Sequence, residues 1–222
     1  MEIQKVIAAR HSVRDYDSRP IEVEKLNRLK SLIDEANAES GLHIQLVSEE
    51  PKAFDSALAH YGKFSGVRNY IALVGNKGSD LEEKSGYYGE KLVLEAQSMG
   101  LNTCWVGLTF KKVPGVISVE KGEKLVCVIA LGYGLTQGVA HKVKDFDAVV
   151  KVDGPAPEWF RSGVESALLA PTAMNQQKFT FEFKGGNVVH ARAGFGFFTK
   201  VDLGIVKLHF ELGAGSGNFS WR

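Results

Sequence analysis

The chain has 222 residues, of which 44% are hydrophobic and 24% are charged, and a formal net charge of +1. These values are typical of a globular protein with enough apolar material for a sizeable core, and a net charge so close to zero argues against a nucleic-acid binder held by bulk electrostatics. No apolar run approaches a membrane span and the first residues do not form a signal peptide, so we expect a cytoplasmic protein without nucleic-acid or membrane partners.

Apolar residues at helical or alternating spacing predict the elements of the chain. In chain order we expect a helix over 2–9, a helix from Pro20 to about Ala36, a strand over 42–47, a helix over 53–61, a buried strand over 70–74, a long helix over 87–99, a central strand over 125–131, a helix over 158–170, strands over 178–183 and 187–191, and a last helix over 201–212. Gly185 and Gly186 predict a tight hairpin between the last two strands.

Two features of this pattern indicate an organisation in two halves. The stretch 134–157 is the least patterned part of the chain and reads as a connection. The pattern of residues 89–96 (GEKLVLEA) resembles that of residues 204–211 (GIVKLHFE), which is the signal expected of a weak internal repeat. If the resemblance is a true duplication, each half supplies one long helix to a shared central pair.

Two distant segments carry the residues best suited to bind a ligand. Residues 10–16 (RHSVRDY) offer two fixed cations, an imidazole and a hydroxyl, and guanidinium groups match phosphate oxygens bidentately. Residues 170–177 (APTAMNQQ) place amide side chains after a helix end, and amides both donate to and accept from the edge of a heteroaromatic ring. Taken alone, the first segment is more often a solvated helix end and the second is more often a helix-to-strand turn.

Together with 100–107 (GLNTCWVG) and 130–133 (ALGY), these segments resemble the motifs of the flavin-dependent nitroreductase family. The run 170–179 is similar to the ring-binding signature of that family, in which Pro-Ser-x-x-Asn-x-Gln-Pro-Trp is usual. In ordinary members the signature follows the Arg/Ser motif closely, whereas here the good copy lies near residue 175. This layout resembles a subgroup, the TM nitroreductases, in which one chain imitates the intertwined dimer of the family.

The resemblance implies an α+β fold, with a mixed, mainly antiparallel sheet flanked by helices and two halves that form a pseudo-dimer within one chain. We expect one unit over 1–222, made of a first half (1–135) with the Arg/Ser motif, a connection (136–157) and a second half (158–222) with the Asn/Gln motif. Such a chain would bind one FMN and would not need to dimerise.

The same resemblance implies the residues of an FMN site. Arg10, His11 and Ser12 would lie at the phosphate end, Arg14 near the pyrimidine edge of the flavin, and Lys142 would add a phosphate cation. The loop over 104–108 would present backbone N–H groups to the ring, and residues of the second half would hold the ring and the ribityl chain. These two groups are Trp105, Val106 and Gly107, and Pro171, Thr172, Met174, Asn175 and Gln177.

The function implied is an FMN-dependent oxidoreductase that carries two electrons from NAD(P)H to a nitroaromatic, a quinone or a similar small acceptor by a ping-pong mechanism. The flavin would do the chemistry, and neither a catalytic side chain nor a metal site is evident in the sequence. Two alternatives stay open: a flavin-binding or sensing protein whose ring face is blocked by Phe195, Phe197 and Phe198, and a scaffold that binds no cofactor. Cys104 and Cys127 lie in apolar segments, and we expect buried free thiols there, as suits a reducing compartment.

Overall fold

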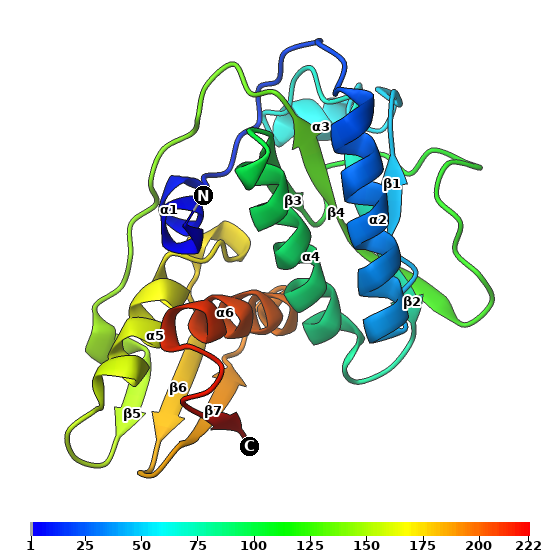
Figure 1. Cartoon of the computed structure of the whole chain (residues 1–222). Helices are drawn as coiled ribbons and strands as arrows, with labels where there is room; N and C mark the ends of the chain where they lie inside the picture. Colours follow the sequence, from blue (N-terminus) through cyan, green and yellow to red (C-terminus); the bar gives the residue numbers. More distant parts are fainter. Residues whose placement is uncertain (1) are drawn as a thin grey trace.

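The computed structural model describes residues 2–222, which form two four-stranded sheets with helices packed between and around them (Figure 1). The helices are α1 (Ile3–Ala9), α2 (Val23–Ser40), α3 (Ala57–Tyr61), α4 (Leu81–Ser98), α5 (Glu158–Leu168) and α6 (Thr199–Ala214), with 3-10 turns η1 (Phe146–Ala148) and η2 (Ala173–Asn175). The strands are β1 (Gln45–Val47), β2 (Asn69–Asn76), β3 (Asn102–Val106), β4 (Glu123–Gly132), β5 (Val150–Val152), β6 (Phe179–Phe183), β7 (Val188–Ala193) and β8 (Ser220–Trp221).

The first sheet has the order β1-β2-β4-β3, with every neighbouring pair antiparallel. β2 and β4 are covered on both faces, which explains why both appear in the sequence as nearly continuous apolar runs. Ile71 and Ile129, which are paired across β2 and β4, face the core formed with α2 and α4. The opposite face, which includes Tyr70 and Val74, packs against Phe54. The expected central strand is therefore confirmed, and it lies beside the equally buried β2.

The second sheet has the order β5-β6-β7-β8 and packs against α5 and α6. The hairpin between β6 and β7 is confirmed, because both Gly185 and Gly186 adopt positive φ angles, of 97° and 65°. Aromatic side chains dominate this core: the rings of Phe181 and Phe210 are stacked with their centroids 4.7 Å apart. Four of the six strand pairings within residues 2–222 are antiparallel, so the mixed, mainly antiparallel α+β fold is confirmed.

Helices α4 and α6 cross each other at the centre of the molecule, between the two sheets (Figure 1). Glycines make the crossing close. A Cβ atom added to Gly86 would lie 2.0 Å from the carbonyl oxygen of Val201, and one added to Gly204 would lie 1.9 Å from the carbonyl oxygen of Glu83. α4 and α6 are therefore a central pair of long helices, as expected, and the division of the chain into two halves that imitate a dimer stays a prediction.

The structure differs from the expected elements in several places, among them the start of α4 and the short strands β5 and β8. α4 begins at Leu81 instead of Tyr87, after Asp80 and with Glu82 and Glu83 in its first turn, where acidic side chains favour the positive end of the helix dipole. The stretch expected to be only a connection contains β5, which pairs in parallel with β6. A strand of three residues with half-exposed side chains leaves no strong pattern in the sequence.

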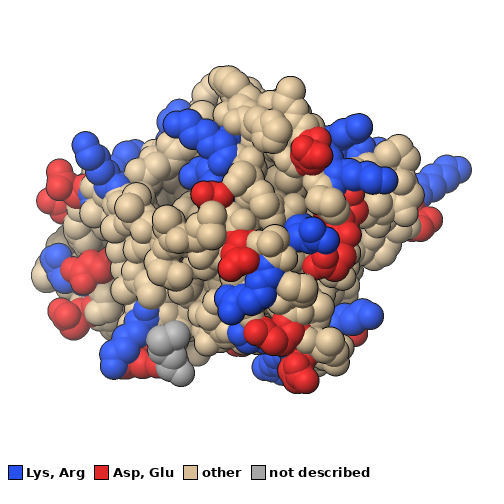
Figure 2. Space-filling view, turned by 90° about the horizontal axis from the view of Figure 1, so that it is seen from above, with Lys and Arg blue, Asp and Glu red and all other residues tan. Residues whose placement is uncertain are grey.

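Charged side chains of both signs are interspersed over the face of the molecule seen in Figure 2, with no continuous field of one sign. Among residues 2–222, no helix combines the length and the apolar character needed to span a membrane.

Candidate functional site

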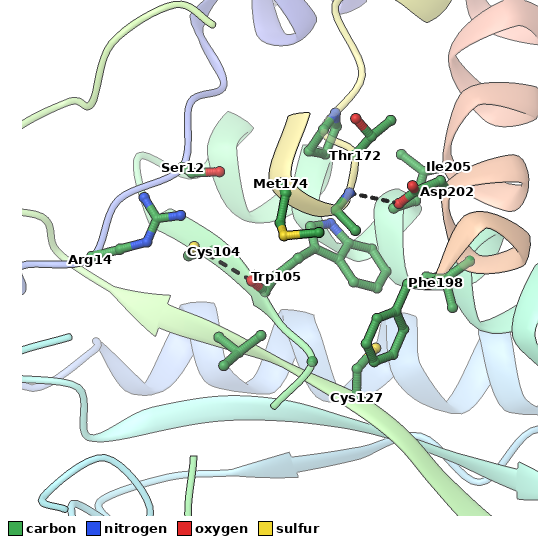
Figure 3. Close-up of a pocket in the computed structure, with 15 residues that line it drawn as sticks. Ser12, Arg14, Cys104, Trp105, Cys127, Thr172, Met174, Phe198, Asp202 and Ile205 are labelled. Atoms are coloured by element: carbon green, nitrogen blue, oxygen red, sulfur yellow. Dashed lines mark hydrogen bonds between the residues drawn. The ribbon is translucent and has the colours of Figure 1, made fainter. Parts of the chain in front are cut away.

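A pocket lies where the N-terminal segment, the end of β3, the loop after α5 and the start of α6 meet (Figure 3). Its volume is about 120 Å³. Residues from both predicted motifs line it together with residues of α6. They are Ser12, Arg14, Cys104, Trp105, Val106, Gly107, Cys127, Pro171, Thr172, Ala173, Met174, Phe198, Val201, Asp202 and Ile205. Segments that are far apart in the sequence thus share one pocket.

The N-terminal segment reaches the pocket because it runs alongside β3. The backbone N–H of Val13 donates to the carbonyl oxygen of Thr103 (3.0 Å), which leaves the side chains of Ser12 and Arg14 at the pocket (Figure 3). Arg14 is exposed, and among residues 2–222 no carboxylate lies within 4.0 Å of its guanidinium. Its charge is therefore available to an anionic or electron-rich ligand.

The cysteines of the pocket are free and buried. Burial raises the pKa of the Cys104 thiol, and the nearby Arg14 guanidinium partly opposes that rise. Burial raises the pKa of the Cys127 thiol as well, so both side chains are neutral hydrophobic groups at physiological pH. The expectation of two buried free thiols is confirmed.

The end of β3 forms one wall of the pocket through Trp105, Val106 and Gly107. The ring of Phe198 lies against the Gly107 backbone, since a Cβ atom added to Gly107 would be 2.5 Å from Phe198 Cε2. Phe198 itself has a φ angle of 57°, in the left-handed region that a bulky residue rarely adopts. An aromatic ring thus occupies the part of the pocket next to the backbone of β3.

The loop after α5 supplies the opposite wall and is unusually strained. Met174, Asn175 and Gln177 all have positive φ angles, of 51°, 53° and 44°. Such a backbone persists only where neighbouring groups hold it, and clusters of this kind are commonest at binding sites. Here Thr172 Oγ1 accepts the N–H of Gln177 at 3.1 Å, and Asp202 of α6 accepts the N–H of Ala173 at 2.9 Å.

The two amides of the predicted signature do not line the pocket. Asn175 Nδ2 and Gln177 Nε2 both donate to the carbonyl oxygen of Lys142, each at 2.8 Å, and Gln177 also donates to Asn175 Oδ1. Gln177 Oε1 accepts the N–H of Lys144 at 2.9 Å. These amides therefore fasten residues 142–144 to the strained loop, and the exposed Lys142 lies outside the lining.

Arg10 and His11 are also outside the lining. Arg10 is only 3% exposed, and its guanidinium faces Glu90 of α4 and the carbonyl oxygen of Leu169. His11 is half-buried, with its Cβ close to Gly138. Of the residues predicted from the sequence, the structure brings Ser12, Arg14, Trp105, Val106, Gly107, Pro171, Thr172 and Met174 together at the pocket.

The pocket also contains an acidic residue, Asp202, that was not predicted from the sequence. Asp202, in the first turn of α6, lines the pocket and accepts a hydrogen bond from the N–H of Ala173 (Figure 3). It also accepts one from Gln176 Nε2 at 2.7 Å. Gln176 Nε2 also donates to the carbonyl oxygen of Phe197. Burial raises the pKa of Asp202 to about 6, against the opposing effect of these hydrogen bonds. Its position depends on the packing of α6, and no sequence motif marks it.

Replacing Asp202 with asparagine should change how stability depends on pH. Burial raises the pKa of Asp202 from 3.8 to about 6, so the native state holds a proton that the unfolded chain releases between these values. The contribution of Asp202 to stability is then fully present below the lower value and is lost as the pH rises through the upper one. On acidification from about pH 7 to about pH 4, the wild type should gain on the order of 2 kcal/mol relative to Asp202→Asn.

Urea unfolding of both proteins across this pH range measures the difference, and effects of the other carboxylates cancel because both proteins share them. Parallel pH profiles would show that Asp202 titrates normally and is not held in the environment described here.

Comparisons with known proteins identify the family of the chain. The family described as "Putative TM nitroreductase" matches residues 2–214, and the chain belongs to this nitroreductase family. A "putative nitroreductase" from Thermotoga maritima MSB8 has a similar structure, with a TM-score of 0.66, 23% identity, and coverage of 97% of this chain and 85% of that one. Membership of this family supports an oxidoreductase. Among curated proteins, no sequence matches the chain.

Two further structures share the fold over a smaller part of the chain. A "putative nitroreductase in complex with FMN" from Desulfovibrio desulfuricans has a TM-score of 0.55 and 14% identity, and the match covers 71% of this chain and 99% of that one. A "putative NADH dehydrogenase/NAD(P)H nitroreductase" from Bacteroides thetaiotaomicron VPI-5482 has a TM-score of 0.53 and 21% identity, with coverage of 66% and 95%.

The groups that line the pocket are chemically suited to FMN, but the volume of the pocket is only partly sufficient for it. A free cation, a hydroxyl and a glycine backbone lie in one lining, and these are the groups that an anionic, planar heteroaromatic ligand needs. The volume of about 120 Å³ is smaller than the roughly 300–1,000 Å³ of most small-molecule sites. The ring of Phe198, which lines the pocket and lies on Gly107, takes up part of the space beside the backbone of β3.

Proposed function

We propose that the chain is an FMN-dependent oxidoreductase that carries two electrons from NAD(P)H to a nitroaromatic, a quinone or a similar small electrophile by a ping-pong mechanism. The observation that supports it best is the single pocket shared by residues 12–14, the end of β3 and residues 171–174. When bound, FMN would supply the redox chemistry, and the protein would supply binding, orientation and electrostatics.

Each residue of the pocket has a role in this proposal. Arg14, with no carboxylate partner, would lie by the pyrimidine edge and favour the anionic reduced cofactor, which raises its reduction potential. Ser12 would donate to the same ligand. Gly107 and the backbone of Val106 would approach the ring, and Trp105 would form the wall beside it. Pro171, Thr172 and Met174 would line the ribityl chain.

The predicted residues that do not line the pocket have supporting roles in the same proposal. Asn175 and Gln177 hold the strained loop to the carbonyl oxygen of Lys142, and so fix Thr172 and Met174 indirectly. The exposed ammonium group of Lys142 is available to a phosphate at the edge of the site. His11 would order the N-terminal segment beside Ser12.

The same proposal covers the organisation of the molecule. The chain would be one unit with a first half (1–135), a connection (136–157) of which β5 joins the second sheet, and a second half (158–222). Because both walls of the pocket come from one chain, a monomer would bind one FMN. A cytoplasmic location would give such an enzyme both NAD(P)H and the reducing conditions that suit free Cys104 and Cys127.

Reconstitution tests the proposal. The purified protein should become yellow with FMN at one equivalent per chain, and the loaded protein should oxidise NADH or NADPH faster when a nitroaromatic or a quinone is present. Heat-denatured protein incubated with the same FMN is the control for free flavin. A protein that stays colourless at saturating FMN would contradict the proposal and favour a scaffold without a cofactor.

A second candidate function, flavin binding without turnover, is favoured by the position of Phe198. Its ring lies against the Gly107 backbone, where a ring of the cofactor or of a substrate would otherwise stack. Phe195 and Phe197, which precede it in the same loop, are 98% and 71% exposed. FMN binding without NAD(P)H oxidation would separate this candidate from the enzyme.

Replacing Phe198 with alanine should enlarge the pocket and strengthen FMN binding by about threefold to tenfold. The reason is that FMN would no longer have to displace a ring that makes close contacts with Gly107. Fluorescence titration of FMN measures the affinity, and Phe195→Ala is the matched control because its ring is fully exposed. Weaker binding to Phe198→Ala would show instead that this ring packs on the cofactor.

A further inference from the structure

A buried cluster of charged side chains lies behind Trp105 and is centred on Glu90 of α4. Glu90 and His209 are both 0% exposed. Glu90 Oε2 accepts a hydrogen bond from Trp105 Nε1, and Glu90 Oε1 faces His209 Nε2, both at 2.9 Å. Arg10 Nε lies 3.8 Å from the same Oε1. The cluster thus joins the N-terminal segment, β3, α4 and α6.

The donor and acceptor roles of the hydrogen bonds indicate where protons lie in this cluster. His209 Nδ1 is 3.2 Å from the carbonyl oxygen of Ser166, which can only accept, so Nδ1 carries a proton. His209 Nε2 faces Glu90, and exactly one proton lies between them. The adjacent Arg10 guanidinium and the donating Trp105 indole both favour negative charge on the Glu90 carboxyl group. Arg10 is therefore a counter-charge of this buried carboxyl group.

The Arg10 side chain contacts this cluster and does not line the pocket. Its side chain is 3% exposed, its Nη2 donates to the carbonyl oxygen of Leu169 at 3.4 Å, and it is absent from the pocket lining. Turning Arg10 toward an anion in the pocket would remove one counter-charge of the buried Glu90, which is costly in a medium of low dielectric constant. Arg14, four residues later, reaches the pocket without such a partner.

Trp105 connects the cluster to the pocket. Its indole N–H is held by Glu90, while the other end of the ring packs on the preceding residue of α4, since a Cβ atom added to Gly89 would be 2.5 Å from Trp105 Cη2. The orientation of this ring, and with it the wall of the pocket, therefore depends on the position of Glu90.

We propose that Arg10 is a positioning residue: it joins the Glu90–His209 cluster, ties the N-terminal segment to the central helices and holds the wall formed by Trp105, and it does not bind the phosphate of the cofactor. The part that concerns the cofactor rests on the proposed FMN function. The part that concerns the cluster does not.

Two flavins that differ only in the phosphate test the first part. The dissociation constants of FMN and riboflavin are measured by flavin fluorescence for the wild type and for Arg10→Gln at one ionic strength. We expect Arg10→Gln to weaken the binding of both flavins to a similar extent. The ratio of the riboflavin dissociation constant to the FMN dissociation constant should then stay within about twofold of the wild-type ratio. A fall of that ratio by about tenfold or more, the loss expected for a charged phosphate contact, would overturn the proposal.

A double-mutant cycle without flavin tests the second part. Urea unfolding, followed by tryptophan fluorescence, compares the wild type, Arg10→Gln, Glu90→Gln and the double variant. We expect the double variant to be clearly more stable than the sum of the single effects predicts, because Arg10→Gln removes a buried cation that Glu90→Gln alone leaves without its carboxylate. Additive effects would overturn the proposal. Recovery of a folded double variant when Glu90→Gln alone does not fold would itself show the coupling.

The flavin titration and the unfolding cycle test the two parts of the proposal independently. If neither flavin binds to the wild type, the FMN function is wrong, and the unfolding cycle still decides whether Arg10 is coupled to Glu90. If neither protein with Glu90→Gln folds, the flavin ratio of Arg10→Gln decides the proposal.

Discussion

Replacing Gly204 with alanine should destabilise the protein by about 3 kcal/mol, although alanine is the better helix former by about 1 kcal/mol. The new Cβ atom would lie 1.9 Å from the carbonyl oxygen of Glu83 and 2.7 Å from the backbone nitrogen of Tyr87. Both atoms belong to the backbone of α4, so no side-chain rotation can relieve the clash, and the two central helices must move apart. Gly86 is in the reciprocal position, against the carbonyl oxygen of Val201.

Urea unfolding followed by tryptophan fluorescence measures this effect. Lys200→Ala is the matched control, since it introduces the same residue into the same helix at an exposed position. The control should stay within about 0.5 kcal/mol of the wild type. A Gly204→Ala protein as stable as the control would mean that α4 and α6 do not approach as closely as described.

The central crossing also shows how far the sequence predicts the fold. The pattern of the two long helices predicted a central pair, and it aligned Gly89 with Gly204. In the structure the reciprocal close contacts join Gly86 and Gly204, and Gly89 instead packs on Trp105. Periodicity reveals which face of a helix is apolar, but the point at which two helices touch depends on residues far away in the chain.

Elements with strong local signals were predicted well, and those that depend on distant partners were not. The β6–β7 hairpin follows from alternating phenylalanines and two turn glycines, all close in sequence. β5 and β8 are short strands that pair in parallel with β6 and β7, and only the neighbouring strand makes them recognisable. The early start of α4 includes Gly86, a poor helix former whose value lies in its contact with α6.

The residues of the candidate site also differ in whether local sequence predicts them. The motifs predicted Ser12, Arg14 and the residues of β3 and the loop after α5, because each motif is a continuous stretch. Asp202 was missed because only the packing of α6 brings it there. The motif of Arg10 assigns it to the phosphate, which stays a prediction, and no signal near Arg10 or Glu90 in the sequence indicates the contact between these two distant residues.

Arg14 is the residue on which FMN affinity should depend most. Its guanidinium lines the pocket, lies 5.9 Å from the centre of the Phe64 ring, and has no carboxylate among residues 2–222 within salt-bridge distance. The adjacent acids are engaged elsewhere: Asp15 accepts from Ser65, and Asp17 accepts from the N–H of Arg19. A cation held without a counter-ion costs little to redirect to a ligand, which is the preorganised state that binding favours.

Arg14→Gln should therefore weaken FMN binding by about 30-fold, or roughly 2 kcal/mol, the amount expected for one charged hydrogen-bonded contact. It should also lower the reduction potential of the bound flavin, because the lost cation stabilises the reduced anion more than the oxidised ring. Arg19→Gln is the matched control: it removes the same charge from the same segment, but its guanidinium stacks on Tyr133, 3.7 Å from the ring centre and outside the pocket. If both variants weakened FMN equally, the effect would be one of net charge alone, and Arg14 would have no direct contact with the cofactor.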